Sequence, residues 1–406
     1  MGLSRSRDGQ EPDLHELARL ADSASAVVVA QVMQTRPAPD PATYIGKGKV
    51  DTLKDDIYEH DADLVIVDGD LTPAQQRNLE RRLETKVIDR TALVLDIFAR
   101  RAKTKEGRLQ VELAQMTYLL PRLTGRGVWL SRLGGGIGTR GPGETKLEVD
   151  RRRIRKRITD LKREIVDLSR HRALQRSARD QFAVVALVGY TNAGKSSLLN
   201  ALTDAGVFVE DKLFATLDPT VRKVTLPNHR PVLVVDTVGF ISHLPHQLVA
   251  AFRATLEEVT AADLLVHVVD ASHPRWREQI TAVNTVLKEL HAADKPLVYA
   301  LNKADRLSNT RVREIVGEIG QGVAISAIHK VGLINLLRDI AQHLDPLERV
   351  RILVPYPQAK TLADISAHGR ILTQEYREQG IAVEAELPRP QAQRLRSLFT
   401  VPDSST

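Results

Sequence analysis

The chain has 406 residues, 42% of them hydrophobic, and it contains no cysteine. This length allows two or three domains with hydrophobic cores, while the lack of cysteine excludes disulfides, thiolate metal sites and thiol nucleophiles. No apolar run approaches the roughly 18 residues that a membrane-spanning helix needs. The sequence therefore predicts a cytoplasmic protein without an integral membrane segment.

The formal net charge of +7 is unevenly distributed along the chain. Residues 151–179 contain twelve Lys or Arg and three Asp or Glu, a net charge of 12 − 3 = +9, so the remainder carries 7 − 9 = −2. A basic segment of this kind is typical of a surface that binds a polyanion, or of a solvated helix face.

Residues 1–25 are predicted to be a flexible tail. The first residues, MGLSRS, also fit the myristoylation pattern M-G-x-x-x-S through Gly2 and Ser6. This match leaves a membrane-linked signalling switch, with weak peripheral membrane association, as one alternative function.

Residues 26–104 alternate between strand and helix patterns. Apolar, β-branched runs indicate buried strands, and Thr72 followed by Pro73 marks a helix start, as N-cap and first helical residue. The alternation implies a small parallel sheet covered by helices. The expected strands are residues 26–32, 62–69 and 86–90, and the expected helices are residues 49–60 and 72–84.

Residues 105–180 are predicted to form a helical hairpin. Apolar residues at spacings of 4, 3, 4 and 3 occur twice, and this seam indicates two antiparallel helices packed together. Pro121 is expected to kink or end the first helix. The seam residues are Leu109, Leu113, Met116, Leu120 and Leu123 in the first helix and Ile154, Ile158, Leu161, Ile165 and Leu168 in the second.

A glycine-rich stretch, RLGGGIGTRGPGETK at residues 132–146, connects the two helices at the tip of the hairpin. It contains the pattern G-x-G-x-x-G at residues 136–141, which dinucleotide-binding loops share. That pattern carries its function only where it follows a strand and opens a helix that covers a sheet. Because no strand is predicted here, we expect the nucleotide to bind elsewhere.

Residues 181–345 are predicted to be a doubly wound α/β domain. Its expected strands are residues 182–188, 221–226, 231–236, 263–269, 296–301 and 322–325. The sequence GYTNAGKS follows the first strand, opens a helix and fits the phosphate-binding pattern G-x-x-x-x-G-K-S. Lys195 is expected to reach the β- and γ-phosphates, and Ser196 to ligate Mg²⁺. The loop residues are Gly189, Tyr190, Thr191, Asn192, Ala193, Gly194, Lys195 and Ser196.

Later strand ends supply the companions of such a loop in the expected order. Asp236 ends an apolar strand, where an aspartate holds Mg²⁺ through water, and Gly239 offers a backbone N–H to the γ-phosphate. Asp305 can accept hydrogen bonds from guanine N1–H and N2–H₂, which adenine does not offer in that arrangement, so GTP is the predicted substrate. The further nucleotide-contacting residues are Thr237, Val238, Asn302 and Lys303, with Ser326, Ala327 and Ile328 beside guanine O6.

A GTPase also needs a threonine that joins the Mg²⁺ shell and senses the γ-phosphate. Thr216 in FATLD is the preferred candidate, and Thr220 is the alternative. The neighbours of Thr216 are expected near the nucleotide. These neighbours are Phe214, Ala215, Leu217 and Asp218, and the expected catalytic groups are Lys195, Thr216 and Gly239.

Phe240 follows Gly239, at a position where many signalling GTPases have a glutamine that orients the attacking water. Phenylalanine cannot hydrogen-bond water, so hydrolysis should be slow in the free protein and should need a partner. The groups close enough in sequence to contribute are Arg222, Arg253, His243 and His246, each of which is also an ordinary surface residue type. Residues 346–406 are predicted to form a small α+β domain with strands at residues 350–355, 370–376 and 381–386.

These motifs together resemble the HflX family of translational GTPases. The resemblance lies in GYTNAGKSSLLN, DKLFATLDPT, DTVGFI, NKAD and, above all, SRLGGGIGTRGPGETKLEVDRRRI, and it covers residues 26–345. It implies a cytoplasmic, monomeric factor that binds the 50S ribosomal subunit and splits stalled or hibernating 70S ribosomes with GTP and Mg²⁺. It also implies some ATP hydrolysis, which guanine recognition by Asp305 does not predict.

The resemblance would place the tip of the hairpin on 23S rRNA near the peptidyl-transferase centre. Glycines let a backbone approach RNA closely, arginine and lysine neutralise phosphates, and tryptophan stacks on bases. The alternative is that the tryptophan packs on the hairpin and the arginines form a solvated face. The candidate RNA-binding residues are Trp129, Arg132, Gly134, Gly135, Gly136, Arg140, Lys146, Arg151, Arg152 and Arg153.

A second function remains open beside ribosome splitting. In that alternative the chain is a nucleotide-gated module that docks on the 50S subunit as an assembly or anti-association factor. Hydrolysis then only resets it.

Overall fold

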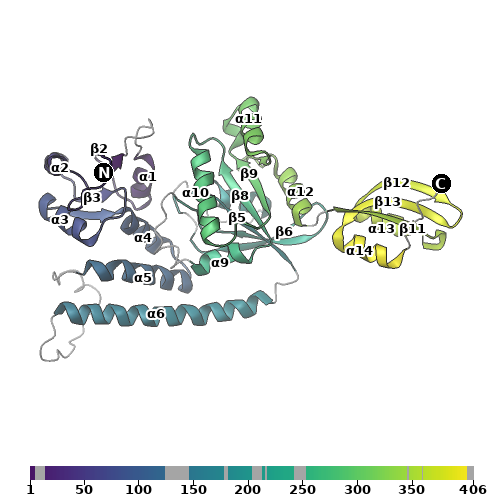
Figure 1. Ribbon diagram of the computed structural model, residues 1–406, viewed down its shortest axis with the longest axis horizontal. Coiled ribbons are helices and arrows are strands. Elements are labelled where there is room, and N and C mark those ends of the chain that lie inside the picture. Colours follow the sequence, from purple (N-terminus) through teal and green to yellow (C-terminus); the bar gives the residue numbers. More distant parts are fainter. Residues whose placement is uncertain are drawn as a thin grey trace.

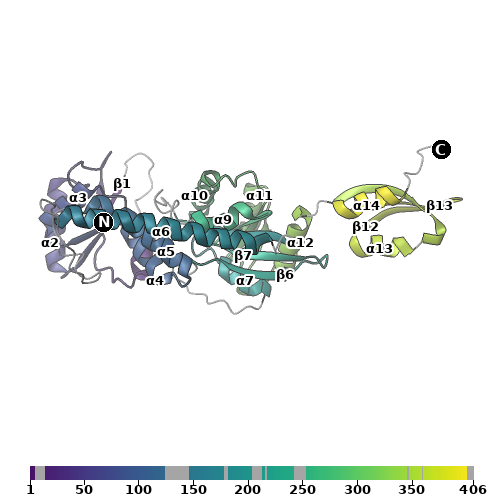
Figure 2. The same ribbon diagram turned by 90° about the horizontal axis from the view of Figure 1, so that it is seen from below.

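The protein is described by a computed structural model in which four structural units follow one another (Figures 1 and 2). An N-terminal α/β unit is followed by the hairpin of α5 and α6, a central sheet with helices on its faces, and a small C-terminal unit. The structure describes residues 1–4, 14–123, 146–177, 182–203, 213–214, 217–241, 253–344, 347–358 and 360–399.

The N-terminal unit is built on short parallel ladders, as the alternation of strands and helices predicted. Strands β1 and β2 pair in parallel, and so do β3 and β4. Met1 joins the two ladders, because its amino group donates to the Ile66 carbonyl at 2.8 Å and its carbonyl accepts from Asp68 N–H at 2.8 Å. The elements are β1 (Gly2–Ser4), α1 (His15–Ser23), β2 (Met33–Thr35), α2 (Lys47–Glu59), β3 (Leu64–Val67), α3 (Pro73–Leu83), β4 (Lys86–Asp89) and α4 (Arg90–Arg101).

Helix α3 begins as its sequence predicted. Thr72 is the N-cap, its side chain accepts a hydrogen bond from the Gln75 backbone, and Pro73 is the first helical residue. The Gln75 side chain in turn accepts from Thr72 N–H at 2.9 Å, which completes a capping box.

Two predictions for the N-terminus were wrong. Residues 14–25 are not a loose tail, because α1 buries Leu17 and Leu20 against α4. Helix α1 lacks a capping side chain at its start, so its N-terminal signal is absent from the sequence. Residues 26–32 form no strand, and Val27 is 88% exposed. Strand β2, which follows directly, is the segment that pairs with β1.

The predicted hairpin consists of α5 (Lys105–Leu119) and α6 (Lys146–Ser177), which lie side by side in both views (Figures 1 and 2). Helix α5 gives way to a 3₁₀ turn, η1 (Leu120–Arg122), at Pro121. All ten seam residues are buried or half-buried, and Arg157 of α6 donates to both carboxylate oxygens of Glu112 of α5, at 2.7 and 2.8 Å. The heptad-like spacing therefore predicted the contact correctly.

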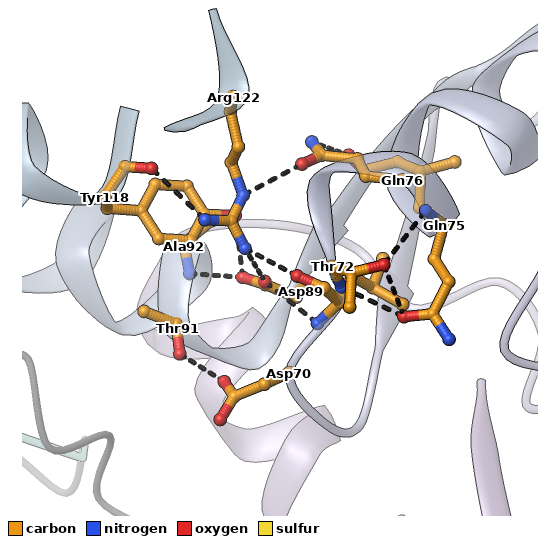
Figure 3. A network of polar contacts seen from close by, with 11 residues as sticks. Asp70, Thr72, Gln75, Gln76, Asp89, Thr91, Ala92, Tyr118 and Arg122 are labelled. Carbon is orange, nitrogen blue, oxygen red and sulfur yellow. Dashed lines mark hydrogen bonds and ion pairs between the residues drawn. The ribbon is translucent and has the colours of Figure 1, made fainter. Parts of the chain in front are cut away.

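A buried polar network fixes the end of α5 to the N-terminal unit (Figure 3). Asp89, which is fully buried, accepts from the Tyr118 hydroxyl at 2.9 Å, from Ala92 N–H at 2.8 Å and from Arg122 at 3.0 Å. The Arg122 guanidinium also stacks on the Tyr118 ring, 3.6 Å from its centroid, and donates to the Leu71 carbonyl at 2.7 Å. The end of α5 and the 3₁₀ turn that follows it are thereby anchored.

Replacing Tyr118 with Phe should loosen this anchor. The change removes one hydrogen bond to a buried carboxylate, which contributes about 1.5–3 kcal/mol. Hydrogen exchange of the α5 backbone amides should accordingly become about ten- to a hundredfold faster, since each 1.4 kcal/mol is a factor of ten. Tyr58→Phe, at a side chain that is 90% exposed, should leave exchange unchanged. Equal exchange in both variants would show that the network does not hold α5.

The central sheet has the order β10-β9-β8-β5-β7-β6, in which only β6 runs antiparallel to its neighbour. Helices α7 and α12 pack on one face, and α9 and α10 pack on the other. This doubly wound arrangement confirms the predicted α/β class. The elements are β5 (Ala183–Val188), α7 (Lys195–Thr203), β6 (Thr220–Thr225), β7 (Pro231–Asp236), α9 (Arg253–Ala261), β8 (Leu264–Asp270), α10 (Trp276–Glu289), β9 (Leu297–Asn302), η3 (Ala304–Arg306), α11 (Asn309–Ile319), β10 (Val323–Ala324) and α12 (Leu333–Leu344).

One hydrophobic core joins the central sheet to the N-terminal elements. Its buried side chains come from α1, α4 and α5 as well as from β5, β8, α9 and α10. Phe98 of α4 and Phe214, which precedes β6, are both fully buried in this core. The units on either side of the hairpin are thus held together by apolar packing as well as by the chain itself.

The C-terminal unit is the predicted small α+β fold. Its strands form an antiparallel sheet in the order β11-β13-β12, with α13 and α14 packed on it. The elements are β11 (Leu347–Val354), η4 (Tyr356–Gln358), α13 (Lys360–His368), β12 (Arg370–Arg377), β13 (Gly380–Pro388) and α14 (Arg389–Leu398). Within the described ranges, none of the helices has the length and hydrophobicity required to span a bilayer.

Candidate nucleotide-binding site

The loop Gly189–Ser196 lies between the carboxyl end of β5 and the first turn of α7. Gly194 has a φ of 95°, which L-residues rarely adopt, and a Cβ there would lie 2.2 Å from the Asn302 amide nitrogen. Glycine is therefore required at this position. Lys195 is buried, and its Nζ donates to the carbonyls of Gly189 and Tyr190 at 3.0 Å each. The lysine is held inside the curve of the loop, where phosphates bind in such loops.

Burial lowers the pKa of Lys195 to about 8, although Asp236 acts in the opposite direction. Bound phosphates would stabilise the ammonium form and raise this pKa, so binding above pH 8 has to take up a proton. We therefore expect the affinity for GDP to fall about fivefold between pH 8 and 9, but less than twofold between pH 7 and 8. Titrations at pH 7, 8 and 9 would measure this; a constant affinity would contradict the assigned environment of Lys195.

Two side-chain oxygens that could bind a metal ion lie close together beside the loop. The Ser196 hydroxyl donates to Asp236 Oδ2 at 2.6 Å, and Asp236, the last residue of β7, is fully buried. Hard oxygen ligands of this kind suit Mg²⁺. The neighbouring Thr237 makes a different contact. Its hydroxyl donates to the Leu187 carbonyl at 2.6 Å and so links the end of β7 to β5.

Gly239 and Phe240 continue from β7 along the loop. A side chain at Gly239 would come within 2.7 Å of Thr191 Cα and 3.1 Å of Lys195 Nζ, so the glycine lies directly against the loop. Phe240 N–H donates to the Gly189 carbonyl at 3.1 Å, and its ring is buried in the hydrophobic core. The ring is therefore structural and cannot orient a water molecule.

The motif NKAD contacts the other side of the loop. Asn302 ends β9 and donates to the Ala193 carbonyl at 2.9 Å, while its oxygen accepts from Ala327 N–H at 3.0 Å. Lys303 donates to the Asn192 carbonyl at 3.0 Å and pairs with Asp270 at 2.6 Å. Asp270 was not among the predicted site residues, because its one sequence signal is its place at the end of β8.

Asp305 lies in η3 with a partly exposed carboxylate. A hydrogen bond from the Ser326 hydroxyl is the largest influence on it and lowers its pKa, so the carboxylate is ionised at neutral pH. Ser326 Oγ also accepts from His329 N–H at 3.2 Å, which fixes the hydroxyl. Ala327 is buried, whereas Ile328 is 69% exposed. The structure thus brings Asp305, Ser326 and Ala327 together beside the loop.

The residues around Thr216 that were predicted to lie near the nucleotide are found in different environments. Phe214 and Leu217 bury their side chains in the hydrophobic core, so any nucleotide contact from them would have to come from the backbone. The Asp218 carboxylate binds the start of α5 instead, where it accepts from Lys103 N–H at 2.9 Å and Thr104 N–H at 3.0 Å. Ala215 and Thr216 lie outside the described residues, while Thr220, the alternative, begins β6.

Most of the candidate RNA-binding residues are also outside the described part of the chain. These residues are Trp129, Arg132, Gly134, Gly135, Gly136 and Arg140, and Lys146 is described only as the first residue of α6. Arg151 donates to the Leu123 carbonyl at 3.1 Å and so bridges the two ends of the hairpin loop. Arg152 and Arg153 are exposed.

Helix α1 also reaches the loop, which the sequence did not suggest. The Tyr190 hydroxyl donates to Glu16 Oε2 at 2.8 Å, and Glu16 also forms an ion pair with buried Arg90. Arg90 in turn donates to Asp68 at 2.8 Å. The N-terminal unit therefore contacts the phosphate-binding loop directly.

Family models match three consecutive parts of the chain. Residues 11–99 match the N-terminal region of a GTP-binding GTPase, residues 101–179 match the middle region of a GTP-binding GTPase, and residues 184–303 match a 50S ribosome-binding GTPase. A GTPase HflX of Caldanaerobacter subterraneus subsp. tengcongensis is 51% identical over 393 residues, which cover 96% of this chain and 90% of the relative. This chain belongs to the HflX family of GTPases.

A second HflX relative and one solved structure show the same similarity. The GTPase HflX of Escherichia coli K12 is 42% identical over 388 residues, covering 95% of this chain and 91% of the relative. A crystal structure of a GTP-binding protein from Sulfolobus solfataricus in complex with GDP is 25% identical, covers 84% of this chain and 98% of its own, and superposes with a TM-score of 0.44. By its family, the chain is a GTPase with a domain of the 50S ribosome-binding class, as its motifs predicted.

Proposed function

We propose that this HflX-family GTPase binds the 50S ribosomal subunit and separates stalled or hibernating 70S ribosomes, with hydrolysis stimulated by the ribosome. The observation that carries this proposal is the arrangement of the hairpin. Helix α6 presents a run of basic residues and leads directly to the glycine-rich stretch, and α5 shares a hydrophobic core with the GTPase sheet. A nucleotide-driven change in the sheet can therefore be transmitted through packed side chains to α5 and so to the proposed RNA-binding tip.

In the proposed site, the residues around the phosphate-binding loop have distinct roles. Lys195 binds the β- and γ-phosphates, Gly239 donates its N–H to the γ-phosphate, and Asp305 selects guanine. Mg²⁺ would be held by Ser196 and Thr216, with Asp236 reaching it through water, and when bound it neutralises phosphate charge. The remaining nucleotide contacts are assigned to the loop residues, Asn302, Lys303, Ser326, Ala327 and Ile328.

The proposed partner surface is the tip of the hairpin. Arginine and lysine from residues 132–153 would neutralise phosphates of 23S rRNA near the peptidyl-transferase centre, and glycines 134–136 would allow close backbone approach. We propose that residues 105–180 act as this RNA-binding unit and residues 181–345 as the GTPase domain, in a monomer.

The buried Phe240 ring makes the partner essential for fast hydrolysis. GTP turnover should therefore be slow for the free protein and should rise about a hundredfold or more with purified 50S subunits, as expected where a partner supplies the missing catalytic group. The absence of stimulation would contradict the proposal. Subunit separation with a non-hydrolysable GTP analogue would instead favour the nucleotide-gated docking module, in which hydrolysis only recycles the protein.

Replacing Gly134, Gly135 and Gly136 with alanine should separate the two activities. Because these residues are predicted to touch RNA and not nucleotide, basal GTP turnover should stay within about twofold, while stimulation by the 50S subunit should fall at least tenfold, about 1.4 kcal/mol. Both rates are measured as phosphate release. An equal loss of both would mean that the glycines have a structural role.

A further inference from the structure

Residues just before Ala215 and Thr216 are held by N-terminal elements and by the phosphate-binding loop. Leu213 N–H donates to the Ser23 hydroxyl of α1 at 3.0 Å. The Phe214 ring meets the Phe98 ring of α4 edge to face, with centroids 4.6 Å apart, and Phe214 N–H donates to the Thr191 hydroxyl at 2.9 Å. This part of the GTPase chain therefore contacts α1, α4 and the phosphate-binding loop at once.

The backbone at Phe214 is strained. Its φ is 58°, in the left-handed region that a bulky side chain rarely adopts. Such a conformation costs about 1–3 kcal/mol and persists only when the surroundings hold it in place. Phe214 therefore keeps this conformation only while its contacts hold it there.

Asp218 connects the other end of this segment to the hairpin. Its Oδ2 accepts from Lys103 N–H and Thr104 N–H, and its Oδ1 accepts from the Thr104 hydroxyl at 2.5 Å. The Thr104 hydroxyl itself accepts from Gly107 N–H at 3.0 Å, so its single proton is available for Asp218. A carboxylate at this end of a helix is also favoured by the helix dipole.

Gly107 makes room for this contact. A Cβ at residue 107 would lie 2.5 Å from Asp218 Oδ1, so a side chain there would displace the carboxylate. Glycine within a helix costs about 0.5–1 kcal/mol relative to alanine. Helix α5 thus has a residue that disfavours the helix but permits the approach of Asp218.

We propose that Asp218 is a positioning residue that couples the nucleotide state of the GTPase domain to the hairpin through the N-cap of α5. Asp218 follows the predicted γ-phosphate sensor Thr216 by two residues. When GDP replaces GTP, Thr216 no longer has a γ-phosphate to contact, and the position of Asp218 changes with it. The first turn of α5 is then capped by Asp218 in one nucleotide state and released in the other. The inference rests on the proposed function for the role of Thr216 and of the hairpin.

Hydrogen exchange of the free protein tests the coupling without ribosomes. In the wild type, loaded with GDP or with a non-hydrolysable GTP analogue, exchange of the amides at the start of α5 should differ at least about fivefold between the two nucleotides. Thr104→Ala and Asp218→Ala should reduce this difference to below about twofold, whereas Thr104→Ser, which keeps the hydroxyl, should preserve it. Thr117→Ala on the exposed face of the same helix is the matched control and should also preserve it.

Failure of the coupling and failure of the proposed function give different results. A nucleotide-dependent difference that persists in Thr104→Ala and Asp218→Ala, or that is absent from the nucleotide-loaded wild type, would overturn the coupling while leaving the proposed function intact. Loading is verified beforehand by binding of fluorescent GDP, and a wild-type protein that fails to bind it would contradict the proposed function and this inference with it. Unchanged GDP affinity of Thr104→Ala shows that this variant is folded.

Discussion

Lys195→Ala should lower the affinity for GTP and GDP by about thirtyfold or more, because removing one partner of a buried charge contact costs about 2–5 kcal/mol. Two features make the effect large. Lys195 is buried and donates to two loop carbonyls at 3.0 Å, so no other cation can take its place without rebuilding the loop. In addition, the loop carbonyls that it now satisfies would be left without that donor in the variant.

Equilibrium binding of fluorescent GDP measures the loss. Lys288→Ala, at an exposed position on α10, is the matched control and should bind as the wild type does. In the absence of nucleotide, hydrogen exchange of α5 should be the same in both variants and in the wild type, because the hairpin seam does not include Lys195. An affinity within about threefold of wild type would mean that the loop does not bind phosphates, which would remove the basis of the assigned site.

Asp305→Asn should weaken GTP binding about a hundredfold and should reduce the preference for GTP over ATP. The carboxylate is ionised, held by the Ser326 hydroxyl and partly exposed beside the loop. Hydrogen bonds to a charged acceptor contribute about 1.5–3 kcal/mol each, and guanine would offer two of them. In the Asp305→Asn variant, by contrast, an amide N–H₂ would face the guanine N–H groups, and two donors cannot bond.

Xanthosine triphosphate distinguishes lost recognition from lost folding. Xanthine carries a carbonyl where guanine carries the N2 amino group, so the amide of the Asp305→Asn variant can donate to it. The variant should therefore bind xanthosine triphosphate more tightly than GTP, whereas Asp294→Asn, an exposed control, should keep the wild-type order. If Asp305→Asn retained the wild-type preference for GTP, guanine selection would have to reside elsewhere.

The arrangement of the candidate nucleotide-binding residues was predictable because its parts are short and local. The loop Gly189–Ser196, Asp236 and the NKAD motif each lie at or just after the carboxyl end of a strand, and the carboxyl ends of parallel strands meet at one edge of a sheet. The contact between the two helices of the hairpin was equally predictable, because ten apolar residues repeat at helical spacing.

The contacts between units were not predictable in the same way. Asp218 and Thr104 are 114 positions apart, and Tyr190 and Glu16 are 174 positions apart, so no local pattern links them. Asp218 in FATLD looked like a nucleotide contact because of its motif, while its carboxylate in fact binds α5. Helix α1 was missed because it lacks a capping side chain and follows a polar stretch.

The most direct test of the account is a cross-link from the tip of the hairpin. A photoreactive amino acid in place of Leu133 should cross-link to 23S rRNA of the 50S subunit when a non-hydrolysable GTP analogue is bound, and far less with GDP. The same group in place of Tyr58, on the exposed face of α2, is the control and should give no nucleotide-dependent product. A Leu133 position that never reaches ribosomal RNA, in a protein shown to bind the 50S subunit, would contradict the claim that the hairpin is the RNA-contacting element.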